Sequence, residues 1–116
     1  MRKIICRYYM TDMGRVPVKE FADELDARSQ RKFFSVVELL ETFVKDLPFP
    51  HAKYIGDEIF ELRFKTVEGA VRVLYFFFHK DNAILTNGFI KKSNKTPLRE
   101  KTVAVERRNT FIQKHP

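Results

Sequence analysis

The fold prediction starts from EIFELRFK, residues 58–65. Apolar and polar side chains alternate along this stretch, and a period of two residues is typical of a β-strand with one face in the core. The apolar side chains are Phe60, Leu62 and Phe64; the polar ones are Glu61, Arg63 and Lys65. The sequence therefore predicts a strand over 58–66 whose apolar side meets a helix and whose polar side stays open.

Two more strands are predicted immediately after this one, over 70–79 and 83–92. Only three residues separate each strand from the next, and connections that short join antiparallel neighbours. The run VRVLYFFF in the second strand is apolar on both faces, so we expect it at the centre of the sheet. A further strand is predicted at 3–9.

Three helices complete the predicted elements, over 17–27, 28–46 and 97–112. Pro17 suits the start of the first, and apolar residues at helical spacing mark the second, which LPFP at 47–50 ends. Thr96 is predicted to cap the third, with Pro97 at its first position. The expected fold is a single α+β domain over 1–116, in the order strand, helix, helix, three strands, helix. Its four-stranded, mainly antiparallel sheet would have the helices on one face and an open basic face.

The charge of the chain is concentrated near its C-terminus. The net charge is +7, and residues 87–116 hold eight basic and two acidic side chains, or +6 of that total. Such a field suits RNA, DNA or an acidic protein, and a solvated helix face explains the charge equally well. The longest apolar runs are too short to span a bilayer, and no cleavable signal is recognisable, so we expect a cytoplasmic protein without a membrane partner.

Several kinds of chemistry find no support in the sequence. The single cysteine, Cys6, fits the alternating pattern of the predicted strand at 3–9, which indicates a buried structural thiol. The three histidines lack the spacing of metal ligands, so no metal and no cofactor are predicted. With only four glycines and no glycine-rich phosphate loop, nucleotide hydrolysis is not favoured either.

A basic cluster on the open sheet face is the strongest candidate site. Strand parity places Arg63 beside Arg72, together with either Lys91 or Lys92, a choice that parity leaves open. Guanidinium groups match phosphate oxygens, and nearby Phe76 or Phe78 could stack on bases. In the alternative interpretation, Arg63 pairs with Glu61 or Glu68 and only keeps the face soluble.

Four stretches together resemble a known family. IFELRF at 59–64, VRVLYFF at 71–77, GFIKKSNKTP at 88–97 and AVERR at 104–108 resemble the HigB-like, phage-associated branch of the RelE/ParE toxin superfamily. The resemblance implies a toxin of a type II toxin–antitoxin module, held inactive by a cognate antitoxin, with which it could form a heterotetramer. It further implies metal-independent cleavage of mRNA on the ribosome, by attack of a ribose 2′-hydroxyl on the adjacent phosphate.

The same resemblance implies roles for individual residues. Arg72 matches a catalytic arginine, Lys91 or Lys92 a second catalytic cation, and Arg63 a phosphate-binding position. Tyr75 and His79 are candidate acids or bases, because no tyrosine follows Tyr75. The remaining expected substrate contacts are Lys65, Phe76, Phe89 and Lys95.

Two other functions remain open at this point. One is a ParE-like protein that inhibits DNA gyrase without catalysis, although relatives of that kind usually lack the G-F-x-K-K motif seen here at 88–92. The other is a degenerate prophage protein that only binds RNA.

Overall fold

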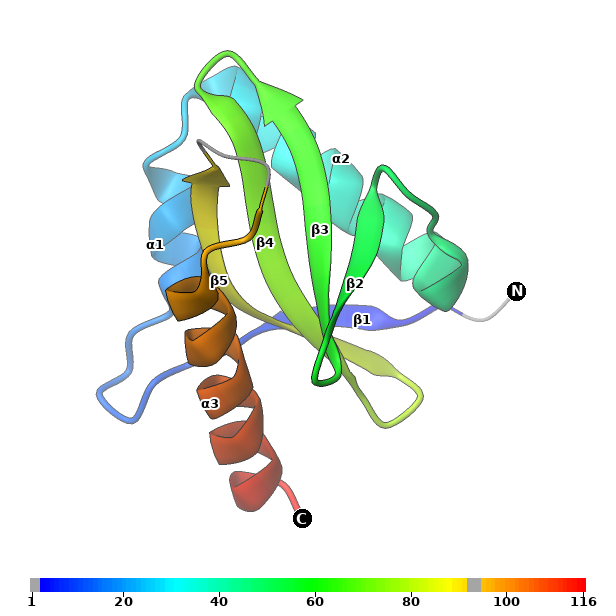
Figure 1. The fold of residues 1–116 in the computed structure, drawn as a ribbon, viewed down its shortest axis with the longest axis vertical. Helices are drawn as coiled ribbons and strands as arrows, with labels where there is room; N and C mark the ends of the chain where they lie inside the picture. Colours follow the sequence, from blue (N-terminus) through cyan, green and yellow to red (C-terminus); the bar gives the residue numbers. More distant parts are fainter. Residues whose placement is uncertain (1–2, 92–94) are drawn as a thin grey trace.

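A single mixed sheet organises the chain, in the strand order β1-β5-β4-β3-β2 (Figure 1). The computed structural model describes residues 3–91 and 95–116. Its strands are β1 (Ile5–Tyr8), β2 (Ala52–Gly56), β3 (Ile59–Thr66), β4 (Gly69–Phe78) and β5 (Asn82–Lys91). Its helices are α1 (Pro17–Asp23), α2 (Ala27–Phe43), the 3₁₀ turn η1 (Val44–Asp46) and α3 (Leu98–Lys114).

The predicted meander is confirmed, but the predicted number of strands is wrong. β4 pairs antiparallel with both β3 and β5, and β1 pairs with β5 in parallel. The fifth strand, β2, pairs antiparallel with β3. None of its five residues is buried, because it is an edge strand, so they carry no clear alternation of buried and exposed side chains. Tyr54 contacts Phe60, with 4.9 Å between the ring centroids.

The first two helices cover one face of the sheet, as predicted. Phe33, Val36 and Leu40 of α2 are buried at helical spacing and belong to one apolar cluster with the inward side chains of the strands. The strand residues of this cluster include Leu62, Phe64, Val71, Val73, Tyr75 and Leu85. The apolar side of EIFELRFK therefore faces α2, as its alternation indicated.

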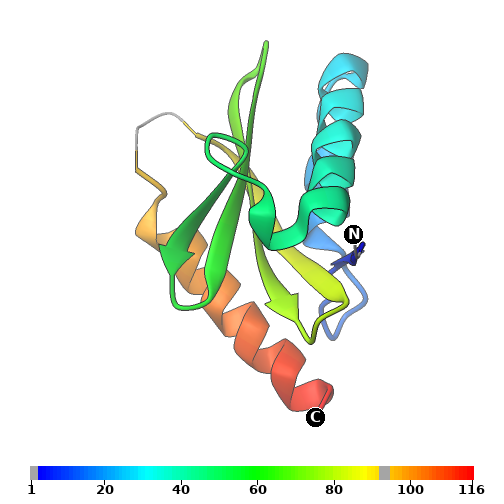
Figure 2. The same cartoon turned by 90° about the vertical axis from the view of Figure 1, so that its right-hand side faces the viewer.

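The expectation that all helices share one face is wrong, because α3 packs on the other one. Figure 2 shows α2 and α3 on opposite sides of the sheet. A second apolar cluster lies beneath α3 and contains Ile59, Leu74, Phe76, Ile84 and Ala104. Because β4 is apolar on both faces, its second face also had to be covered, and α3 supplies that cover. The open basic face is thus reduced to the end of the sheet beyond α3.

A β-bulge in β5 decides which side chains face α3. Leu74 pairs with Asn87, but the next residue of β4, Tyr75, pairs with Leu85, so Thr86 is the extra residue. The Thr86 hydroxyl donates to the Asn87 side-chain oxygen over 2.7 Å. Because one residue is inserted, the alternation after the bulge is inverted relative to the alternation before it.

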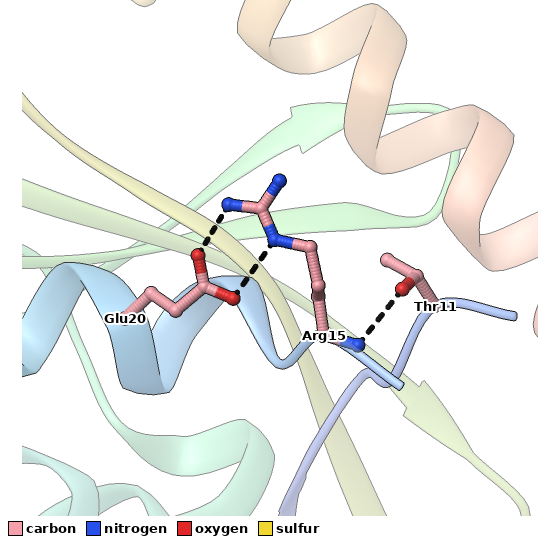
Figure 3. Close-up of polar contacts among 3 residues, drawn as sticks. All are labelled: Thr11, Arg15 and Glu20. Carbon is pink, nitrogen blue, oxygen red and sulfur yellow. Dashed lines mark hydrogen bonds and ion pairs between the residues drawn. The ribbon is translucent and has the colours of Figure 1, made fainter. Parts of the chain in front are cut away.

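The connection between β1 and α1 is closed by polar contacts (Figure 3). Arg15 donates from Nε and Nη2 to the carboxylate of Glu20, over 3.1 and 2.6 Å, and its backbone N–H donates to the Thr11 hydroxyl. Pro17 occupies the first turn of α1, as predicted. The helix then lies so close to β5 that a Cβ atom on Gly88 would sit 2.6 Å from the ring of Phe21.

Candidate active site

The candidate site is organised by one buried carboxylate, that of Glu61 on β3. Its side chain is 2% exposed, and its Oε1 atom lies 3.3 Å from Nε of Arg72 and 3.6 Å from Nε of Arg63. The hydroxyl of Thr96 hydrogen-bonds its other oxygen, Oε2. A buried carboxylate needs partners of this kind, because ionised groups without them are expensive to remove from water. Glu61 therefore holds two guanidinium groups and the entry to α3 together.

The two arginines are direct neighbours across β3 and β4, as the strand parity predicted. Arg63 pairs with Arg72 in the sheet register. Arg72 is almost wholly buried and donates from Nη1 to its neighbouring Val71 carbonyl, 3.0 Å away. Arg63 is more exposed, and its guanidinium lies over the ring of Phe49, 4.8 Å from the ring centroid. Arg72 is thus held in place by contacts inside the protein, whereas the side chain of Arg63 lies nearer the solvent.

The bulge in β5 places Lys91 on the same face as these arginines. Arg72 pairs with Phe89, and Ala70 with Lys91, so Lys91 lies one step along the face that carries Arg72. Parity alone left Lys91 and Lys92 as equal candidates; Lys92 falls outside the described residues. Burial lowers the pKa of Lys91, an effect that Glu61 opposes and that the positive charges of Arg72 and Arg63 reinforce. Lys91 therefore releases its proton more readily than an exposed lysine does.

The arginines repel one another as well. Burial is the first cause that lowers the pKa of Arg72, the charge of Arg63 is the second, and Glu61 acts in the opposite direction. Even so, an arginine remains protonated under ordinary conditions. Three cations, Arg63, Arg72 and Lys91, surround one carboxylate, and three positive charges less one negative charge leave a surplus of two.

Thr96 does not cap α3, contrary to its prediction. The helix begins at Leu98 with Pro97 at the cap position, and no side chain of the cap residue bonds the first turn. The Thr96 hydroxyl is used by Glu61 instead. A cap signal in the sequence cannot reveal this choice, because the competing acceptor is 35 residues away.

Three of the predicted site residues lie away from the cluster. Tyr75 is on the opposite face, 1% exposed, and stacks on Phe60; burial raises its pKa further. His79 follows the far end of β4 in a left-handed conformation (φ 53°), and its ring contacts that of Phe78 in a tilted arrangement. Phe76 is fully buried beneath Phe111 of α3 and offers no surface to a base.

The other predicted contacts are nearer. Phe89 is the register neighbour of Arg72 and is partly buried, and Lys65 is exposed on β3, two residues beyond Arg63. Lys95 is exposed just before Thr96. The sequence interpretation missed the central role of Glu61. Glu61 lies on the polar side of the predicted strand, so the pattern indicated a surface residue. The only indication of its role was the alternative interpretation, in which Arg63 pairs with Glu61.

Neither a reactive thiol, a metal site nor a membrane-spanning helix is found among the described residues. Burial, followed by the charge of Glu41, raises the pKa of Cys6 to about 12, so its thiol is a poor nucleophile. Within residues 3–91 and 95–116, no group of three histidine, cysteine or acidic side chains is arranged to hold a metal ion. No helix in the same described ranges is long and apolar enough to cross a membrane.

The fold and the site together define a small α+β protein with a cation cluster built around a buried carboxylate. A family model described as "Phage derived protein Gp49-like (DUF891)" matches residues 20–109, and the chain belongs to that family. The matched range contains Glu61, Arg63, Arg72 and Lys91. No curated protein matches the chain.

Proposed function

We propose that this protein is the toxin of a type II toxin–antitoxin module and cleaves mRNA as a HigB-like endoribonuclease. The Gp49-like family is associated with toxin–antitoxin systems, which supports the coarser part of the proposal. The finer part rests on one observation: Arg63, Arg72 and Lys91 surround Glu61, and this cluster carries a surplus of two positive charges at one end of the sheet. A phosphodiester carries one negative charge and its pentacoordinate transition state carries nearly two, so this surplus favours the transition state over the ground state.

In the proposed reaction the ribose 2′-oxygen attacks the adjacent phosphorus, and the bond from phosphorus to the 5′-oxygen breaks. The products are a 2′,3′-cyclic phosphate and a 5′-hydroxyl, so no water is consumed. Arg72 and Arg63 contact the phosphate oxygens, and Lys91 donates its proton to the departing 5′-oxygen. The 2′-hydroxyl proton passes to solvent water, which later reprotonates Lys91. Glu61 does not react; it fixes the direction of the Arg72 guanidinium.

The ribosome and the antitoxin are the proposed partners. A ribosome-bound mRNA is already held in one conformation, so an enzyme that acts on it there needs few groups of its own. An antitoxin would neutralise the cluster most directly with acidic and apolar side chains laid over the basic end of the sheet.

Inducible expression in a bacterial host, with mapping of mRNA 5′ ends, tests the proposal. The wild type should arrest growth and create new 5′-hydroxyl ends, and Arg72→Ala should do neither. Arg99→Ala is the matched control, because Arg99 is 87% exposed on α3 and should leave both effects intact. Arrest with intact mRNA would instead point to a gyrase-type target. Equal cleavage by Arg72→Ala would remove the catalytic role of the cluster.

A further inference from the structure

Two neighbouring cavities lie between the N-terminal half of α2 and the edge of β3. One, of about 290 Å³, is bounded by Ser29 and Thr66. The other, of about 260 Å³, reaches Arg72. Both are lined by Lys32 of α2 and Lys65 of β3, so they adjoin one another and are together named the α2–β3 groove. β2 pairs with β3 from Ile59 to Leu62, and the His51 carbonyl accepts the Arg63 N–H, so Lys65 lies beyond the paired part of this edge.

The α2–β3 groove is strongly basic. Its cationic lining residues are Arg28, Lys32, Arg63, Lys65 and Arg72, and none of the described residues that line the two cavities is acidic. Two carboxylates offset part of this charge: Glu61 pairs with both Arg63 and Arg72, and Asp26 interacts with Arg28. Five cations against these two carboxylates leave a positive surplus for an external polyanion.

The wall of the groove next to Arg72 is apolar. Pro50 is exposed and lines the same cavity as Arg63 and Arg72, whereas Val36 of α2 and Phe64 of β3, which also line it, are only 4% and 6% exposed. Sites for single-stranded nucleic acid combine a basic track for the backbone with apolar or aromatic surfaces for the bases. An acidic peptide could use the same cations, but the groove reaches Arg72, to which the proposed function assigns the scissile phosphate, and this continuity favours RNA.

We infer that the α2–β3 groove binds the single-stranded RNA on one side of the cleaved phosphate. The backbone would run past Lys32 and Lys65, and one base would rest against the exposed Pro50. This inference rests on the proposed function, because it continues the substrate outward from Arg72. In this arrangement the RNA runs from Arg72 toward the start of α2 and away from α3.

The test measures binding of an RNA that cannot be cut. A fluorescein-labelled oligonucleotide with 2′-O-methyl groups throughout has no attacking hydroxyl, and its binding to the full chain is followed by fluorescence anisotropy at several salt concentrations. Lys32→Gln and Lys65→Gln should each weaken binding several-fold and reduce the slope of log K against log salt by about 0.7, one phosphate contact on a single strand. Lys80→Gln, an equally exposed lysine in the β4–β5 turn, is the matched control and should change neither quantity.

Competitors separate the possible occupants. Inorganic polyphosphate of equal charge should displace the labelled oligonucleotide less efficiently than the unlabelled oligonucleotide does, because polyphosphate has no base for the apolar wall. Failure of the wild type to bind, or equal losses in Lys80→Gln, would overturn the inference. It is overturned as well if a labelled poly-glutamate peptide, and not the oligonucleotide, responds to Lys32 and Lys65. Since the probe is uncleavable, groove binding without mRNA cleavage in cells refutes the function alone, and cleavage without groove binding refutes the groove alone.

Discussion

Glu61 and Arg72 form an ion pair inside the protein, with 3.3 Å between Oε1 and Nε and less than a tenth of either side chain exposed. Among the described residues, the buried Nε atom of Arg72 has no hydrogen-bond partner, so the pair relies on charge attraction. Such a pair contributes little to stability by itself, but removal of one partner leaves the other charge buried and uncompensated. The arrangement keeps Arg72 in place beside Arg63.

Glu61→Gln should destabilise the protein. The substitution leaves two arginines and Lys91 without their counter-charge, at a cost of about 3 kcal/mol in the free energy of unfolding. Urea denaturation measures this loss, with Glu106→Gln on the exposed side of α3 as the control that should stay within about 0.5 kcal/mol of the wild type. Equal stability of Glu61→Gln and Glu106→Gln would show that the carboxylate does not hold the cluster.

Lys91 predicts a pH dependence of stability. Its pKa in the folded state lies below the ordinary value of 10.5, so between these two values the unfolded chain binds more protons and the wild type becomes more stable as pH rises. Lys91→Met lacks this titration. The free energy of unfolding of Lys91→Met minus that of the wild type should therefore fall as pH rises through this window and level off above 10.5. A difference that is constant or increases with pH would contradict a lowered pKa.

Thr96→Val should weaken the attachment of α3 to the sheet. Valine keeps the shape of threonine but removes the hydroxyl that bonds Glu61, at a cost of about 1–2 kcal/mol because the acceptor is charged and buried. Thr102→Val, on an exposed part of α3, provides the same chemical change without the bond. Unfolding curves for the two variants should differ by that amount, and coincident curves would show that the hydroxyl bond contributes nothing.

Gly88→Ala should disturb the contact between β5 and α1. The new methyl group would lie 2.6 Å from the Phe21 ring, too close without a shift of the ring or the helix, and such overpacking costs about 1–3 kcal/mol. Phe21→Leu removes the clashing edge, so the double variant should regain part of the stability lost in Gly88→Ala. A double-mutant cycle measures this coupling, and strictly additive losses would mean that the two positions do not touch.

Local patterns predicted a large part of this structure. The period of two in EIFELRFK gave the correct inward and outward faces of β3, and the short connections gave the antiparallel meander. These features depend on neighbours within a few residues. The adjacency of Arg63 and Arg72 followed from the same rule, because a tight hairpin fixes the register of its two strands.

The features that escaped prediction depend on distant contacts. The bulge at Thr86 has no mark in the sequence, and yet it decides that Lys91 joins Arg72. The side on which α3 packs and the bond from Thr96 to Glu61 are equally non-local. β2 was missed for a different reason: a short, exposed edge strand has too few buried residues to show a period.

The parallel pairing of β1 with β5 also bears on how the chain is made. Ile5 pairs with Asn82, so the first strand to leave the ribosome has to wait until 77 further residues have been synthesised (82 − 5 = 77). At about 5–20 residues per second, this delay is roughly 4–15 s. Lys91 and Thr96 are translated later still. The first strand and the cation cluster therefore both gain their partners only after β3 and β4 have been made.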